Sequence, residues 1–212
     1  MMTRSRLFLA SLSLAIASCS TIYYAAWEKL GYEKRDLLKS AVKKARGEQK
    51  DAGKEFQDAL TQLKKLTNYD GGNLESAYNR FKGQYEDCEA QATAVRGRIR
   101  EVDTVARDLF REWEKEIRQY EDASLAADSR RKLADTRARF EPLSRSLHAA
   151  EATMEPVLRK FRDQVLYLKH NLNAAAIGSL RGQADNIQYD IQRLLDQMNR
   201  SIAEADRFIQ TL

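Results

Sequence analysis

The stretch that decides the fold runs from Leu74 to Tyr120 and reads LESAYNRFKGQYEDCEAQATAVRGRIREVDTVARDLFREWEKEIRQY. Apolar or small residues recur along it in alternating steps of four and three, with one slip near Trp113. They form a seam of Leu74, Tyr78, Phe81, Tyr85, Cys88, Ala92, Val95, Ile99, Val102, Ala106, Leu109, Trp113, Ile117 and Tyr120. A seam that repeats every 3.5 residues is typical of a coiled coil. We therefore predict a single helix about 70 Å long across this stretch.

Similar seams lie on both sides of this stretch. One runs through Leu133, Phe140, Leu143, Leu147, Ala150, Met154, Val157, Phe161, Val165, Leu168 and Leu172, and another through Leu180, Ala184, Ile187, Ile191, Leu194, Met198, Ile202, Ala205 and Phe208. Pro142 and Pro156 lie inside the first of these, so we expect a kink near one of them.

The earliest seam is the least regular. It contains Leu30, Leu37, Ala41, Ala45, Ala52, Phe56, Ala59, Leu63 and Leu66, and the charged segment from Lys43 to Glu55 includes Gly47 and Gly53. Because alanine dominates its middle, we expect close but weak packing there, and we expect this helix to be the most mobile.

Turn-forming residues separate the seams. Asn68–Asn73 contains two glycines, and Asn73 can cap the helix that follows. A weaker break lies at Glu121–Asp128, where Ser124 or Asp128 could act as the cap, and Asn171–Ser179 is a short turn or only a bend. The chain is therefore predicted to be all-α, a long antiparallel coiled-coil bundle of three or four helices.

The first residues have the features of a bacterial secretory signal. Arg4 and Arg6 precede a short apolar core, and Ile16-Ala17-Ser18-Cys19 resembles a lipobox. We predict a lipoprotein signal peptide at residues 1–18, lipidation of Cys19 and one helical domain at residues 19–212. An ordinary cleaved signal with a coincidental cysteine is the alternative.

Lipidation determines the expected location. Several acyl chains anchor a protein stably to a membrane. Ser20 follows the cysteine where an aspartate would indicate inner-membrane retention, so we expect the periplasmic face of the outer membrane, with the inner membrane as the alternative. Removing residues 1–18 takes away Arg4 and Arg6 and no acid, so 36 basic and 31 acidic residues become 34 and 31. This small excess, interleaved with acids, argues against a nucleic-acid partner.

No residue pattern for catalysis, a metal or a cofactor is found. His148 and His170 are the only histidines, and the sequence contains no Cys-x-x-Cys, P-loop or nucleophile-elbow motif. We expect neither enzymatic activity nor a cofactor.

Two polar or reactive features have alternative interpretations. Lys169-His170-Asn171 with Asn173 could be a recognition site, or could satisfy the free backbone groups where two helices meet. Cys88 lies on the seam and is expected to be buried and inert, with an intermolecular disulfide as the alternative.

An aromatic group follows the lipidation site closely. Tyr23, Tyr24 and Trp27 lie within a few residues of Cys19. They could sit at the membrane interface, where rings with polar tips are favoured, or pack against the bundle as an apolar plug.

Several stretches resemble a family of Gram-negative bacterial lipoproteins known only as a domain of unknown function. The resemblance rests on YAAWEKLG at residues 24–31, EKRDLL at 33–38, YDGG at 69–72, LFREW at 109–113 and DQVLYLKHNLNA at 163–174. It implies an envelope protein, and it assigns no catalytic or binding residue.

These observations favour a lipid-anchored periplasmic coiled-coil protein with a structural or protein-interaction role in the cell envelope. Its partners would be the membrane, through Cys19, and another protein or a second copy, through its helices. The alternative is a lipid-binding or membrane-remodelling module whose bundle opens to expose its apolar seams. A third class, an envelope enzyme, has no motif in its support.

Overall fold

The fold is a bundle of four helices. The computed structural model describes residues 34–68 and 73–212, so the predicted signal peptide, Cys19 and Tyr23, Tyr24 and Trp27 lie outside the described residues. The helices are α2 (Lys34–Thr67), α3 (Leu74–Ile117), α4 (Ala123–His170) and α5 (Ala174–Thr211). The described residues contain no strand. The predicted all-α antiparallel bundle is confirmed, with four helices.

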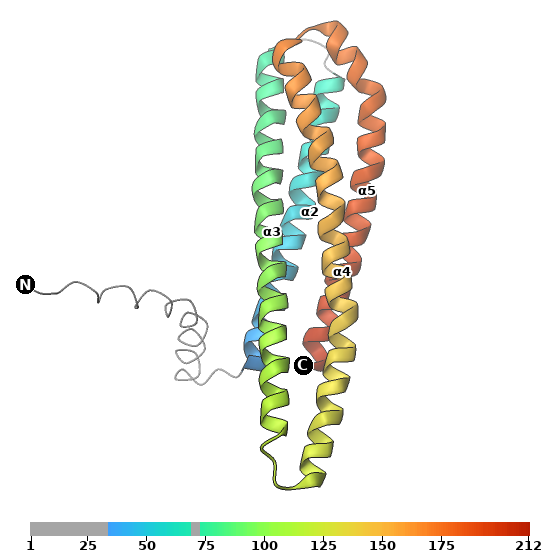
Figure 1. Cartoon of the computed structure of the whole chain (residues 1–212). Coiled ribbons are helices and arrows are strands. Elements are labelled where there is room, and N and C mark those ends of the chain that lie inside the picture. The colour runs from blue at the N-terminus through green and yellow to red at the C-terminus, as the bar shows by residue number, and fades with distance from the viewer. Residues whose placement is uncertain (1–33, 69–72) are drawn as a thin grey trace, which may run out of the picture.

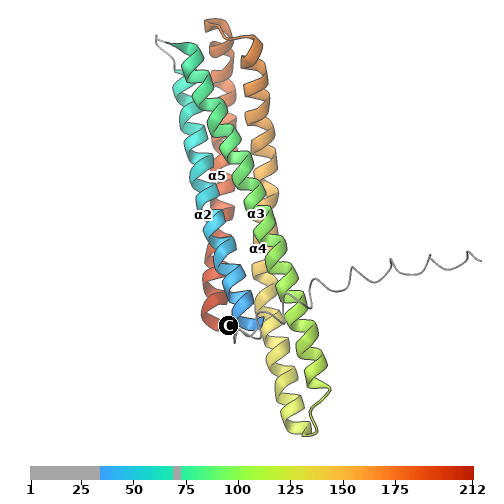
Figure 2. The ribbon, with the colours of Figure 1, turned by 90° about the vertical axis from the view of Figure 1, so that its left-hand side faces the viewer.

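The helices form a ring in which each helix packs against two neighbours. α2 contacts α3 and α5, and α4 contacts α3 and α5. Successive helices run in opposite directions (Figure 1). α3 and α4 extend beyond the start of α2 and the end of α5 (Figures 1 and 2). We call this two-helix extension, residues 113–136, the overhang.

Each connection ends in a side chain that caps the next helix. Asn73 Oδ1 accepts a hydrogen bond from the backbone N–H of Ser76 at 2.9 Å, which confirms the predicted cap of α3. α4 is capped by Asp122, which accepts from Ser124 N–H at 2.7 Å, so the expected caps Ser124 and Asp128 were wrong. Asp122 lies just before the helix, where its side chain reaches the free amides of the first turn. The third break is a short turn.

α4 runs unbroken through both prolines, and neither proline starts the helix. Proline removes the hydrogen bond to the carbonyl four residues earlier. Those carbonyls belong to Ala138 and Ala152, which are both exposed, so water can satisfy them. The apolar seam on either side keeps the helix packed on α3 and α5, and the kink expected near one of the prolines stays a prediction.

The core follows the seams closely, and α2 approaches α5 through small residues. A Cβ added to Gly53 would lie 3.3 Å from Leu195 Cδ2, so the two helices are in close contact at this height. The predicted close packing is confirmed at this position, while the weakness of that packing and the mobility of the helix stay predictions. The core also contains two fully buried polar residues, Gln49 on α2 and Ser201 on α5.

Candidate interaction surfaces

The polar cluster at the turn between α4 and α5 serves the helix ends. Asn173 Oδ1 accepts from Ala176 N–H at 2.9 Å and caps α5. Asn171 Nδ2 donates to the carbonyl of Tyr167 at 3.0 Å. Lys169 and His170 lie in the last turn of α4, where positive charge interacts favourably with the helix dipole. Capping therefore accounts for the two asparagines, and this cluster offers no built recognition site.

Cys88 is a buried thiol on α3. Its side chain has no exposed area. Burial, followed by the nearby carboxylates Glu55, Asp87 and Asp58, raises the pKa of the thiol far above its ordinary value. Because the thiolate is the reactive form, this cysteine is chemically inert while the bundle is closed. The expectation of a buried thiol on the seam is confirmed.

His148 belongs to a surface network of charges between α3 and α4. Its Nε2 lies 2.9 Å from Asp103 Oδ2, and its Nδ1 lies 3.4 Å from Glu151 Oε2. The ring is half exposed. Within residues 34–68 and 73–212, no group of three or more His, Cys, Asp or Glu side chains is arranged to hold a metal ion. The contact of His148 with Asp103 joins α4 to α3 at the surface of the bundle.

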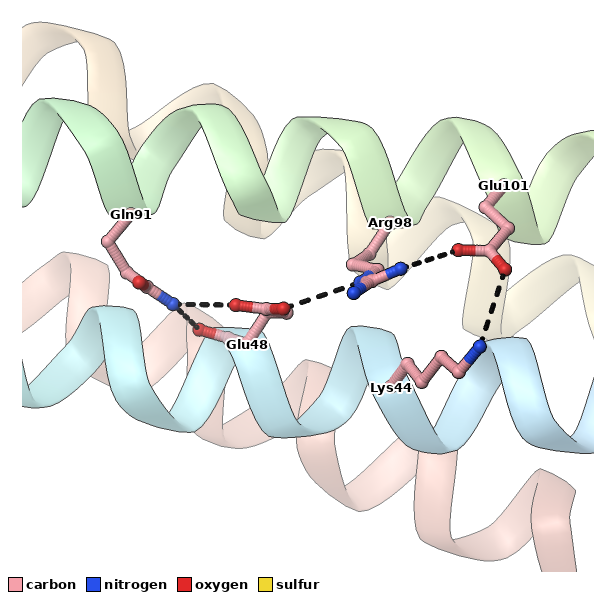
Figure 3. Close-up of polar contacts among 5 residues, drawn as sticks. All are labelled: Lys44, Glu48, Gln91, Arg98 and Glu101. Atoms are coloured by element: carbon pink, nitrogen blue, oxygen red, sulfur yellow. Dashed lines mark hydrogen bonds and ion pairs between the residues drawn. The ribbon is translucent and has the colours of Figure 1, made fainter.

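A second network joins α2 to α3 (Figure 3). Glu48 accepts from Gln91 Nε2 at 2.9 Å and from Arg98 Nε at 3.3 Å. Arg98 also donates to Glu101 at 3.0 Å, and Lys44 lies 3.9 Å from Glu101. Hydrogen bonds to Glu101 and Glu48 raise the pKa of Arg98. Exposed pairs of this kind contribute little stability one by one, and a network of several contributes more than an isolated pair.

An open groove between α3 and α4 carries mixed charge. It is lined by Tyr85, Glu89, Ala90, Thr93, Arg96, Glu155, Leu158, Arg159 and Arg162. Arg96 donates to Glu155 at 2.7 Å, and Arg159 lies 3.8 Å from the same carboxylate. Two of the three arginines that line this groove, Arg96 and Arg159, therefore already have an anionic partner.

Large exposed hydrophobic side chains occur in three places. Tyr120 and Leu125 are on the overhang, at 47% and 56% exposure. Leu166 and Tyr167 lie near the opposite end of the rod, in the last turns of α4, and Tyr189 lies on α5. Exposed apolar groups at the two ends of a long bundle are candidate contacts with other surfaces.

The folded part of the chain that the structure describes is a closed, elongated four-helix bundle with a charged surface. None of α2, α3, α4 and α5 combines the length and the apolar character needed to cross a membrane. The chain belongs to the family described as "protein of unknown function (DUF2959)", whose model matches residues 23–212. No curated protein and no solved structure is significantly similar to it.

Sequence reasoning missed Gln49 and Ser201. The first seam steps from Ala45 to Ala52, and position 49 fills the step between them, four residues after one and three before the other. The spacing therefore places position 49 on the seam, but glutamine is polar and so was not counted among the apolar residues that define it. On α5 the expected Ile202 is half-buried, and Ser201 occupies the buried position beside it.

Proposed function

We propose that this protein is a lipid-anchored periplasmic rod of the outer membrane, with a structural or protein-interaction role in the cell envelope. The observation that carries the proposal is a bundle whose apolar seams face inward wherever α2, α3, α4 and α5 pack together. Such a bundle gives a fixed length and a charged outer surface. The lipobox ending in Cys19 supports the anchor.

The position of α2 determines how such a rod would be oriented. α2 begins beside the overhang, because Lys34 forms an ion pair with Glu112 near the end of α3. A tether that enters at Lys34 holds the overhang end near the membrane. α2 has 34 residues, so the far turns lie about 50 Å away along the bundle. Leu166 and Tyr167 are at that far end and are available to a protein partner or a second copy.

The anchor is tested by Cys19→Ser in the producing bacterium. We expect the variant to be exported and to appear in the soluble periplasmic fraction, while Cys88→Ser remains in the outer-membrane fraction. The pair is matched, since each removes one thiol and only one removes the lipidation site. A Cys19→Ser protein that stays in the membrane fraction would contradict lipid anchoring.

The interaction role is tested by photo-crosslinking from the far end of the rod. A photo-reactive phenylalanine at Tyr167 should capture an envelope protein or a second copy. The same probe at Arg131, on the exposed side of the overhang, should not capture the same protein. Equal capture from both positions, or none from Tyr167, would argue against a docking surface at the far end.

A lipid-binding module is the second candidate, and one observation favours it. Gln49 and Ser201 are buried without a hydrogen-bond partner among the described residues, which lowers the free energy needed to part α2 from α5. The Cys19→Ser protein would be mixed with anionic and with neutral vesicles and sedimented. Co-sedimentation with either would support opening onto lipid, and its failure with both would exclude it.

A further inference from the structure

Elsewhere in the bundle, α2 and α5 pack against the apolar sides of α3 and α4. On the overhang, the described parts of α2 and α5 do not reach this side, which we call the inner side. Every seventh residue of α3 from Tyr78 onward faces the bundle interior, through Tyr85, Ala92, Ile99 and Ala106. Trp113 is the next residue in this series. Tyr120 follows seven residues later, but it lies in the turn beyond the end of α3 at Ile117. The described parts of α2 and α5 stop short of them.

Two contacts show where the described parts of α2 and α5 stop packing against α3 and α4. Lys34, the first residue of α2, pairs with Glu112. Near the end of α5, the ring of Phe208 packs on Phe140 of α4 with centroids 5.7 Å apart. From residue 113 of α3 to residue 136 of α4, the described structure therefore consists of two helices side by side (Figure 2).

The inner side of the overhang carries Trp113, and the turn beyond α3 carries Tyr120; both rings are incompletely buried. Trp113 is half-buried and its Nε1 donates to Ser129 Oγ at 2.9 Å, which holds the indole between the two helices. Tyr120 is 47% exposed. Elsewhere on the overhang, Arg137 pairs with Glu114 at 2.8 Å, and its guanidinium lies 5.2 Å from the Phe110 ring centroid.

We propose that this inner side of the overhang binds the segment formed by residues 23–33 of the same chain. Connectivity is the first argument, since this segment leads directly into Lys34 at the base of the overhang. A covalently attached segment has a very high effective concentration at a surface beside its attachment point. The family match is the second, because it starts at residue 23 and so includes this segment in one unit with the bundle.

The composition of the segment fits the surface. It contains Tyr23, Tyr24, Trp27 and Leu30. Tyr24 and Trp27 precede the buried residues Leu38 and Ala41 by two heptads, so they fall on the same seam. Aromatic side chains are well suited to pack against Trp113 and Tyr120 while their polar tips reach solvent.

Residues 23–33 are also long enough to reach the turn of the overhang. From Glu112 the overhang reaches about 15 Å to its turn. Eleven residues span about 16 Å when helical and more when extended. Docked there, the segment would hold Cys19 near the tip of the overhang, and the rod would stand directly on its anchor.

A photo-crosslink tests the contact in the full chain. Benzoylphenylalanine replaces Trp27 in the producing cells, and crosslinked peptides are mapped after irradiation. We expect crosslinks within one chain to peptides from residues 113–136, and none from the same probe at Tyr189, on the outer side of α5. A crosslinked dimer would show that a second copy covers the surface, and capture of lipid alone would place Trp27 in the membrane. Either result overturns the proposal.

Hydrogen exchange supplies a second measurement that does not depend on photochemistry. In the purified full chain, Trp27→Ser should speed amide exchange at residues 113–133 by at least about fivefold, and Trp27→Phe should preserve protection. Peptides from residues 143–165 act as the internal control for folding. Unchanged exchange in Trp27→Ser overturns the proposal. This measurement needs no lipid, so its outcome is independent of whether Cys19 anchors the protein.

Discussion

Two neighbouring layers of the core are built on the same heptad pattern with opposite chemistry. In the aromatic layer, Phe56, Phe81 and Phe161 are fully buried on three helices. The Phe81 and Phe161 rings meet edge to face with centroids 5.7 Å apart, and Phe56 stacks on Phe161 at 6.4 Å. Such rings bury a large apolar area and add specific ring-to-ring attraction.

The polar layer lies two turns from Phe56 toward the start of α2. Gln49 replaces the apolar residue there, and Ser201 of α5 lies at the same height, between the contact of Gly53 with Met198 and the ion pair of Arg46 with Asp206. Gln49 Nε2 and Oε1 and Ser201 Oγ have no hydrogen-bond partner in the described structure. Buried polar groups of this kind are destabilising.

The two layers have different consequences: the aromatic layer stabilises the closed bundle, and the polar layer marks where the bundle can open. The aromatic layer holds three helices together by area and shape, and a closed bundle depends on it. The polar layer sits in the part of α2 that has small inward residues, so it is where the bundle can part with the least loss of apolar contact.

The largest effect is expected in the aromatic layer. Phe161→Ala removes the ring that contacts both other phenylalanines and leaves a cavity, so it should lower the free energy of unfolding by about 3–5 kcal/mol. Urea denaturation followed by circular dichroism measures the change. Tyr189→Ala, which removes an exposed ring, is the matched control and should change little. A loss below about 1 kcal/mol for Phe161→Ala would show that the layer is not a stability determinant.

Cys88 reports opening next to both layers. In a Cys19→Ser chain it is the only thiol, and burial raises its pKa and blocks access. We expect a thiol reagent at pH 8 to label it about a thousandfold more slowly than it labels the urea-unfolded chain. Stopped-flow or manual mixing gives both rates. Labelling within tenfold of the unfolded rate would mean that the bundle opens far more readily than its burial indicates.

The polar layer should respond to its removal. Gln49→Met keeps a similar volume and removes two unsatisfied polar atoms, so it should raise the free energy of unfolding by about 1–3 kcal/mol and slow the labelling of Cys88. Gln57→Met, at an exposed position of the same helix, is the control and should be neutral. Destabilisation by Gln49→Met would indicate that the amide is satisfied by bound water and contributes to the fold.

The smallest effect concerns two glycines of α2. Gly47 has nothing within 4 Å of an added Cβ, so Gly47→Ala should stabilise the helix by about 0.5–1 kcal/mol. Gly53→Ala should gain less, because its Cβ would meet Leu195 Cδ2 at 3.3 Å. Thermal unfolding of the two variants measures the difference. Equal gains would show that α5 moves away from Gly53 without cost.

Particular residues show how far the sequence could lead. The seam of α3 predicted most of its buried residues, because a 3.5-residue repeat leaves only one face to bury. Its last member was wrong, since α3 ends at Ile117 and Tyr120 lies beyond it, 47% exposed. Asn73 was identified as a cap from its place after a glycine turn, whereas Asp122 was overlooked because several capping residues follow one another there. The sequence left two interpretations of Asn171 and Asn173, a recognition site and helix capping, and their hydrogen bonds to backbone groups favour capping.

The sequence by itself determined that the chain is helical, where its helices break and which face of each is apolar, because these follow from local periodicity and turn chemistry. Only the tertiary structure decided that Gln49 and Ser201 share a core layer and that α5 approaches α2 closely at Gly53. It also showed that α3 and α4 extend beyond the described parts of α2 and α5. These features depend on the relative heights of helices that are distant in the chain, and periodicity within a single helix carries no information about that alignment.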